Sequence, residues 1–196
     1  MIGLFGGAFN PPHLGHLALA EGALAAFPLT SLEILVSGDP AHKRVDCPVE
    51  TRVALAELAF GAWPNTTVRA DPYRYTVDLL RAERPRDALF LVGADQYRDF
   101  PTWKEPEAVL ELARLGVATR AGVERPPVPP EHEARVSFFE IDSPPISSRD
   151  LRERAGRGEA LDGLVQPAVA AEITRRGLYR PRGYTGLVID AEDLTA

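Results

Sequence analysis

The chain has 196 residues, of which 45% are hydrophobic, and it carries a formal net charge of −6 at pH 7. This length suits one domain with modest additions, and the single cysteine, Cys47, excludes an intramolecular disulfide. No run approaches the roughly 18 apolar residues of a membrane-spanning helix, no signal peptide is recognisable, and the acidic balance argues against a nucleic-acid polymer, so we expect a cytoplasmic protein with small-molecule ligands.

Apolar strand-like runs alternate with segments of helical period over most of the chain. In order, we predict strand 1–7, helix 16–27, strand 32–37, helix 50–63, strand 67–70, helix 76–84, strand 88–95, helix 106–115, strand 116–120 and strand 135–141. Elements of these lengths imply right-handed crossovers and a mostly parallel sheet covered on both faces. The sequence therefore predicts a doubly wound α/β fold.

The helical period also predicts which side chains face the core. The first two helices would bury Leu14, Leu17, Leu24 and Phe27, and then Leu55, Leu58, Ala59 and Ala62. Pro106 suits the first turn of its helix, because proline lacks the N–H that is unpaired there.

The alternation stops after the strand at 135–141. Segments 146–156 and 165–179 have helical character, with Ser147 or Ser148 as an N-cap and Gly177 just beyond the last turn. We expect a domain over residues 1–180, with a small helical part from about 146. The remaining residues, 181–196, have no helical period, and we interpret them as a mobile tail rather than a packed arm.

Chemistry-bearing residues concentrate in GGAFNPPHLGH, from Gly6 to His16, between the first strand and the first helix. The glycines let the backbone approach a ligand closely, and His13 and His16 lie on roughly one face of the helix start. A helix N-terminus favours anions through its unpaired amides and its dipole. The motif therefore predicts a phosphate site, although its spacing matches neither GxGxxG nor a P-loop.

Two histidines three residues apart could instead form half of a metal site, or be ordinary core or surface residues. No third histidine or cysteine stands near them, and His42 and His132 lie in loops of different composition. We therefore assign no metal-ligating residue.

The opening motif and four later segments resemble the HxGH nucleotidyltransferases and, more closely, the bacterial nicotinate mononucleotide adenylyltransferases. The later segments are PAHKR at 40–44, YTVDLL at 75–80, VGADQYRDFPTWKE at 92–105 and ISSRDLR at 146–152. The resemblance implies a Rossmann-like nucleotidyltransferase fold. It also implies a reaction in which the phosphate of nicotinate mononucleotide attacks the α-phosphorus of ATP and releases pyrophosphate.

The resemblance also implies roles for the residues at matching positions. The catalytic set would be His13, His16, Lys43 and Arg152, with His16 stabilising charge on the transferring phosphate, a task that a protonated imidazole would assist. The ATP-binding residues would be Gly6, Gly7, Phe9, His13, His16, Gly93, Asp95, Ile146, Ser147 and Arg152. The acceptor would be bound by Lys43, Thr76, Trp103 and Lys104, where backbone amides favour a carboxylate over a carboxamide.

Two positions depart from the family pattern. Arg149 stands where Thr or Ser is usual; it would be either an extra phosphate contact or a surface change, and we leave it out of the catalytic set. Lys104 stands where an aromatic residue often follows the tryptophan, so Lys104 would act through its backbone amide rather than by stacking.

The implied partners are ATP, nicotinate mononucleotide and Mg²⁺, with the ion carried mainly by the ATP phosphates. Homo-oligomerisation is left open, as are two alternatives for the function. One is a related transferase that acts on nicotinamide mononucleotide, pantetheine phosphate or an alcohol phosphate with CTP. The other is a nucleotide-binding module without turnover.

Overall fold

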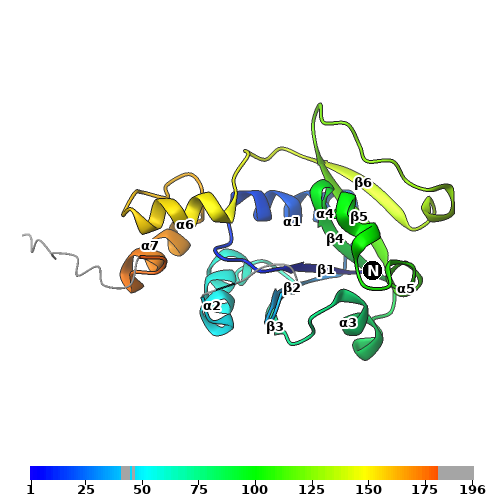
Figure 1. The fold of residues 1–196 in the computed structure, drawn as a ribbon, viewed down its shortest axis with the longest axis horizontal. Coiled ribbons are helices and arrows are strands. Elements are labelled where there is room, and N and C mark those ends of the chain that lie inside the picture. Colours follow the sequence, from blue (N-terminus) through cyan, green and yellow to red (C-terminus); the bar gives the residue numbers. More distant parts are fainter. Residues whose placement is uncertain (41–44, 46, 181–196) are drawn as a thin grey trace, which may run out of the picture.

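Six parallel strands form the centre of the protein in a computed structural model that describes residues 1–40, 45 and 47–180 (Figure 1). The order across the sheet is β3-β2-β1-β4-β5-β6, and each neighbouring pair runs parallel. The winding reverses between β1 and β4, which confirms the predicted doubly wound architecture. The strands are β1 (Ile2–Gly7), β2 (Ser31–Ser37), β3 (Thr66–Asp71), β4 (Ala88–Gly93), β5 (Arg114–Arg120) and β6 (Val136–Ile141).

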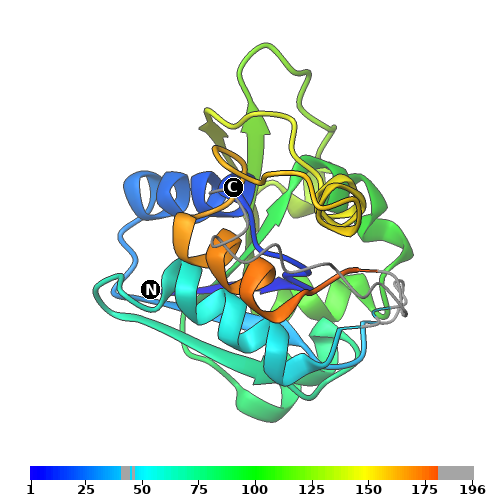
Figure 2. The same ribbon diagram turned by 90° about the vertical axis from the view of Figure 1, so that its left-hand side faces the viewer.

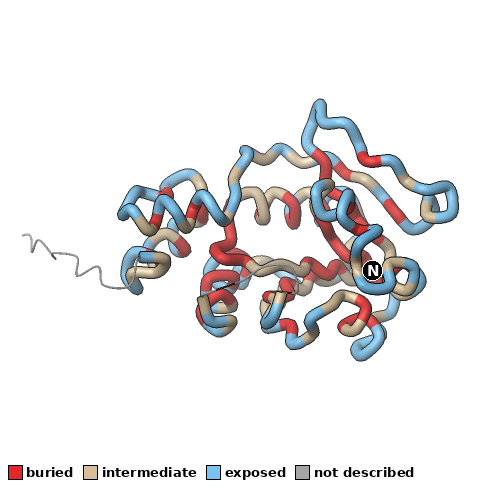
Figure 3. Tube along the Cα trace, in the orientation of Figure 1, coloured by how far each residue is buried: buried red, intermediate tan, exposed pale blue. Residues whose placement is uncertain are grey.

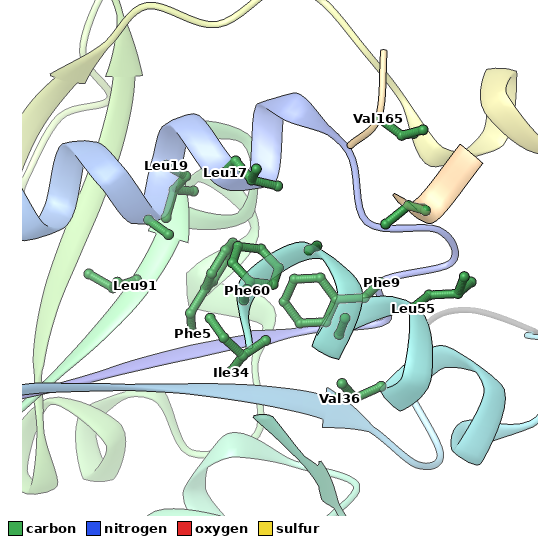
Figure 4. Close-up of a cluster of buried hydrophobic side chains, with 14 of the residues drawn as sticks. Phe5, Phe9, Leu17, Leu19, Ile34, Val36, Leu55, Phe60, Leu91 and Val165 are labelled. Carbon is green, nitrogen blue, oxygen red and sulfur yellow. The ribbon is translucent and has the colours of Figure 1, made fainter. Parts of the chain in front are cut away.

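Helices cover both faces of the sheet. Successive strand residues point to opposite faces, so Phe5 packs with α1 and α2, whereas Leu4 packs with α3 and α5. Figure 4 shows the first of these two apolar cores, in which Phe5, Phe9 and Phe60 lie together. The helices are α1 (Leu14–Ala26), α2 (Val49–Phe60), α3 (Thr76–Glu83), α4 (Ala94–Asp99), α5 (Pro106–Leu112), α6 (Ser148–Gly156) and α7 (Pro167–Arg176), with short 3-10 helices at Phe100–Thr102 and Pro130–His132.

Each predicted element is present, but some boundaries are wrong. Helix α5 ends at Leu112, earlier than predicted, because Arg114 already pairs with Leu89 of β4 as part of β5. Strand β4 ends at Gly93, so Asp95 lies in the first turn of the unpredicted helix α4 rather than at the end of a strand. Strand pairing, which is a tertiary contact, overrides the local helical period in α5.

The predicted core faces of the first two helices are partly wrong. Leu24 and Leu58 are 38% and 43% exposed, and Ala62 is exposed as well. Small residues of α1 face the sheet because the helix approaches β6 closely: a Cβ on Gly22 would lie 2.7 Å from Cγ2 of Ile141. The side chains that are buried are Leu17, Leu19, Ala20 and Ala23 on α1, and Thr51, Arg52, Leu55, Ala56, Ala59 and Phe60 on α2.

The two C-terminal helices lie beyond the carboxyl ends of the strands (Figure 1), and α7 lies against α2 (Figure 2). As predicted, Ser147 caps α6: its Oγ accepts from the Asp150 N–H at 3.1 Å. Gly177 ends α7 with a φ of 59°, a left-handed conformation that glycine adopts easily. Arg176 of α7 donates to Oγ1 of Thr51 at 3.2 Å, which links the helical part to the sheet domain.

Burial concentrates in the strands and on the inner sides of the helices, while the connection between β5 and β6 is mostly exposed (Figure 3). None of the described helices is long and apolar enough to cross a membrane. The predicted tail at 181–196 lies outside the described residues, and the domain boundary at residue 180 stays a prediction.

Candidate active site

Two adjoining cavities lie at the carboxyl ends of β1 and β4, where the winding of the sheet reverses. Their volumes are about 720 and 420 Å³. Gly6, Gly7, Ala8 and Gln96 line both cavities, so the turn after β1 forms a wall that the two share. Ligands of open α/β sheets bind at such a reversal point, because the neighbouring loops diverge there and leave a crevice.

The C-terminal helical part holds this turn in place. Nη1 of Arg152 donates to the Asn10 carbonyl at 2.8 Å, and Oγ of Ser148 donates to the Pro11 carbonyl at 2.9 Å. The hydroxyl of Tyr179 donates to Oδ1 of Asn10 at 2.9 Å, and burial raises the pKa of Tyr179, so this hydroxyl stays protonated at neutral pH. The turn is therefore anchored by residues that are far from it in sequence.

His13 and His16 lie at the start of α1, with their rings stacked and their centroids 3.7 Å apart. His13 is the N-cap, and its backbone N–H donates to Nδ1 of His16 at 3.1 Å. A neutral imidazole that accepts through Nδ1 carries its proton on Nε2. This bond, together with the Phe9 ring centred 5.1 Å from that of His16, sets both the tautomer and the orientation of His16.

His13 is buried, with only 8% of the residue exposed. Burial, and secondarily the positive charge of Arg120, lower its pKa from 6.5 to about 4. Its Nδ1 has no hydrogen-bond partner among the described residues. In the ligand-free protein His13 is therefore neutral at pH 7, and its ring offers a hydrogen bond rather than a charge.

The larger cavity brings together every residue that was predicted to bind ATP. These are Gly6, Gly7, Phe9, His13, His16, Gly93, Asp95, Ile146, Ser147 and Arg152. They come from the end of β1 and the turn after it, the start of α1, the junction of β4 with α4, and α6 with the segment that leads into it, so segments far apart in the sequence meet here. Their roles stay predictions, but their proximity is a fact of the fold.

The larger cavity is also more basic than the sequence motifs suggested. Arg98, Arg120 and Arg149 line it in addition to Arg152, whereas Asp95 is the only carboxylate among its described lining residues. An acidic protein therefore has a locally cationic cavity, which suits a polyphosphate. Two of these arginines already have partners: Arg98 pairs with Asp95 at 2.6 Å, and Arg149 pairs with Glu153 at 3.1 Å.

Sequence reasoning missed Arg120 and Gln96 as lining residues. Arg120 ends β5, so the rule that ligands gather at the carboxyl ends of strands could have found it. Gln96 lies in the unpredicted helix α4, where its Oε1 accepts from the Gly93 N–H at 3.2 Å. The family segment at 92–105 contains this helix, but the prediction extended the preceding strand to residue 95 and so concealed the helix.

The smaller cavity contains three of the predicted acceptor-binding residues, Thr76, Trp103 and Lys104. Thr76 is the first residue of α3, as predicted, and Tyr75 is the N-cap of that helix. Nζ of Lys104 lies 2.9 and 3.0 Å from the two carboxylate oxygens of Asp78, and 5.0 Å from the centre of the Tyr75 ring. The ammonium of Lys104, a residue that lines this cavity, is therefore paired with Asp78.

Aromatic packing holds Trp103 at the cavity wall. Its ring meets Phe90 edge to face, with centroids 6.2 Å apart, and meets Phe100 at 5.4 Å. One face of the smaller cavity is therefore a rigid aromatic surface of the kind on which a flat ring can stack.

The predicted catalytic residue Lys43 lies outside the described residues. No group of three His, Cys, Asp or Glu side chains that could hold a metal ion occurs in the part of the chain that the structure describes.

Arg52 was not singled out from the sequence, and it is the largest fully buried side chain, with 1% of the residue exposed. Its guanidinium donates to the carbonyls of Ala8 at 2.8 Å, Ser37 at 2.7 Å, Cys47 at 3.1 Å and Gly38 at 3.4 Å. A buried charge on the core face of a helix has no signature in the hydrophobic period, which would assign such a residue to the surface.

Comparisons with known proteins agree with this geometry. Residues 4–154 match the model of the family described as Cytidylyltransferase-like. The chain is 40% identical over 191 residues to a probable nicotinate-nucleotide adenylyltransferase of Thermus thermophilus, covering 91% of this chain and 99% of the relative. It is 36% identical to a protein of the same description from Thermomicrobium roseum, covering 91% of each chain. The solved structure of Plasmodium falciparum nicotinic acid mononucleotide adenylyltransferase complexed with NaAD superposes with a TM-score of 0.73 at 16% identity, covering 91% of this chain and 96% of that one.

Proposed function

Because the chain belongs to the cytidylyltransferase-like family and, within it, to the nicotinate-nucleotide adenylyltransferases, we propose that its larger cavity takes ATP and its smaller cavity takes nicotinate mononucleotide. The enzyme transfers the adenylyl group of ATP to nicotinate mononucleotide, which gives nicotinate adenine dinucleotide and pyrophosphate, a step of NAD biosynthesis.

One observation carries this division of the site: the two cavities meet at the end of β1 and the start of the turn after it, at Gly6, Gly7 and Ala8. The reaction joins the phosphate of one nucleotide to the α-phosphorus of another, so both phosphates must lie at one place while the two bases lie apart. Two cavities with a common wall meet that requirement. Glycine is needed in this wall because a Cβ on Gly6 would lie 2.9 Å from the Phe90 ring and a Cβ on Gly7 would lie 3.0 Å from the Phe9 ring.

In the proposed mechanism, an oxygen of the acceptor phosphate forms a bond to the α-phosphorus as the bond from that phosphorus to the leaving pyrophosphate oxygen breaks. No covalent enzyme intermediate forms, so the protein contributes position and charge stabilisation. His16 would donate from Nε2 to an oxygen of the α-phosphate, since its Nδ1 is occupied by the His13 N–H. A donor aimed at charge that grows in the transition state lowers the barrier more than it strengthens substrate binding.

His13 and Arg152 would hold the phosphates on either side of His16. His13 lines the larger cavity, and its neutral ring would offer a hydrogen bond to a phosphate there. One N–H of the Arg152 guanidinium donates to the Asn10 carbonyl, and the other N–H groups of the guanidinium can donate to a phosphate in the same cavity. We also propose Lys43 as an acceptor-phosphate contact, on the resemblance of its motif alone.

Acceptor choice would rest on the smaller cavity. Trp103 offers a ring face to the pyridine ring, and the backbone amides near Thr76 and Lys104 suit a carboxylate, which accepts hydrogen bonds without offering any. A carboxamide presents N–H groups to the same donors, so the acid is favoured over the amide.

Nucleotidyltransferases of this kind generally use a divalent metal. We propose Mg²⁺, held by triphosphate oxygens and water, because Mg²⁺ commonly keeps several waters and binds through substrate phosphates. When bound, the ion neutralises charge on the triphosphate. The protein itself would hold the triphosphate through His13 and the arginines that line the larger cavity.

The test is to incubate the protein with ATP, Mg²⁺ and one acceptor at a time, and to measure pyrophosphate and dinucleotide. The acceptors are nicotinate mononucleotide, nicotinamide mononucleotide and pantetheine phosphate. We expect product with the first at the highest kcat/KM. Absence of product with all three would overturn the enzymatic function, and preference for the amide would overturn the assignment of the acceptor.

A further inference from the structure

Arg52 joins three segments that are separate in the sequence. It lies on α2, and its four hydrogen bonds reach Ala8 in the turn after β1, Ser37 and Gly38 at the end of β2, and Cys47 just before α2. The guanidinium thus binds both sides of the connection between β2 and α2, and ties them to the turn that separates the two cavities.

The way in which Arg52 is buried is unusual for a charged side chain. Its guanidinium forms no ion pair with Asp or Glu in the part of the chain that the structure describes, and all four acceptors are neutral carbonyls. Burial of a charge without a counter-charge is unfavourable. Leucine or methionine would fill the same space but would leave the four carbonyls without a donor, which is also costly. The arginine at this position therefore serves the carbonyls of the turn and of the end of β2 rather than the apolar core.

The acceptors of Arg52 also have a bearing on phosphate binding. Ala8 lines both cavities and Ser37 lines the smaller one, whereas Arg52 itself lines neither. The carbonyl oxygens of Ala8 and Ser37 are therefore turned toward the core. Carbonyl oxygens that faced the cavities would repel phosphate oxygens. Because a trans peptide is planar, turning the Ala8 carbonyl inward also points the N–H of the same peptide, that of Phe9, the opposite way.

We propose that Arg52 is a positioning residue for the adenylyl transfer: it holds the carbonyl oxygens of Ala8 and Ser37 away from the cavities and keeps the shared wall in register with the end of β2. This inference rests on the proposed function. It adds to that function a residue that acts through the backbone without touching substrate. Lysine cannot replace it fully, because one ammonium cannot reach carbonyls on three segments with the geometry of the guanidinium fork.

The experiment compares the wild type with Arg52→Met and Arg52→Lys, with Leu55→Ala as the matched control. Leu55 is fully buried on the same helix but contacts the apolar core, so its truncation destabilises the fold without releasing the turn. Activity is expressed per folded molecule, with the folded fraction taken from circular dichroism, and ATP affinity is measured separately by calorimetry.

We expect Arg52→Met to lower kcat per folded molecule by about tenfold or more and to weaken ATP binding, as misplacement of reacting groups does. Arg52→Lys should fall between Arg52→Met and the wild type, and Leu55→Ala should keep wild-type kcat and ATP affinity per folded molecule. Equal kcat and ATP affinity in Arg52→Met and Leu55→Ala would overturn the proposal. If Arg52→Met does not fold, Arg52→Lys decides in its place, and wild-type values for it would overturn the proposal.

The calorimetric arm separates the two inferences. If the wild type bound ATP but made no dinucleotide, the proposed function would fail, while a loss of ATP affinity in the Arg52 variants, absent in Leu55→Ala, would still support the positioning role.

Discussion

Burial of neutral His13 makes the stability of the ligand-free protein depend on pH. In the folded chain the pKa of His13 is lowered from 6.5 to about 4, by burial first and by the charge of Arg120 second. As pH falls from 6.5 toward 4, the unfolded chain takes up a proton on this histidine and the folded chain does not. Stability is therefore lost across this window as the solution is acidified, and it is regained as pH rises.

The size of the effect follows from the pKa values. One pKa unit corresponds to about 1.36 kcal/mol, so a fall from 6.5 to about 4 corresponds to about 3 kcal/mol of unfolding free energy. Of the whole residue only 8% is exposed, so solvent screening reduces this figure little. That is a large share of the 5–15 kcal/mol typical of a folded domain, and it is roughly the whole effect of one disruptive mutation.

Urea unfolding between pH 4 and pH 7.5 measures this contribution as the difference between the wild type and His13→Asn. Carboxylates also titrate in this range, but they are common to both proteins and cancel in the difference. We expect the wild type to lose about 3 kcal/mol more than the variant. His132→Gln, which removes a histidine that contacts Glu107 away from both cavities, is the matched control.

A direct titration of the His13 ring by NMR gives a second measurement of the same pKa. Parallel stability curves for the wild type and His13→Asn, or a ring that titrates near 6.5, would refute the reasoning. Either result would mean that the His13 ring is hydrated in solution.

Four further substitutions test the site and the fold. His16→Ala should fold normally and lower kcat by about 10² or more, as loss of a donor to the transition state commonly does; unchanged turnover would remove His16 from the mechanism. Asp78→Asn leaves the ammonium of Lys104 without its counter-charge, so the ratio of kcat/KM for the acid to kcat/KM for the amide should rise about threefold. Lys104→Gln should lower the same ratio. Equal ratios in the wild type and both variants would confine Lys104 to a role of its backbone. Gly22→Ala should lower the urea midpoint, because its Cβ would lie 2.7 Å from Cγ2 of Ile141 and overpacking outweighs the roughly 1 kcal/mol gained in helix propensity. A higher midpoint would show that β6 moves to accommodate the added methyl group.

The order of elements and the location of the chemistry were predictable from local patterns. Apolar runs and helical periods carry the α/β alternation, and parallel strands of such a fold end at one edge of the sheet. The glycines and histidines of the opening motif, the Ser147 cap and the Gly177 stop are likewise local, because each depends on backbone conformation within a few residues. These features need no knowledge of distant contacts.

Other properties depend on what packs against a residue. Leu24 matches a helical stripe but is exposed, because the close approach of α1 to β6 turns smaller side chains toward the sheet. The neutral state of His13 follows from its burial and from Arg120, a residue more than one hundred positions away in the chain. No pattern of spacing contains that information.

The sequence by itself determined which residue types are available for phosphate chemistry and on which strand and helix ends they lie, since short-range geometry sets those positions. Only the tertiary structure decided that the residues predicted to bind ATP line one cavity, that Thr76, Trp103 and Lys104 line an adjoining one, and that the two cavities share Gly6, Gly7 and Ala8. The role of Arg52 also depends on the tertiary structure. The sequence shows its charge, but its four carbonyl partners come from three segments that only folding brings together.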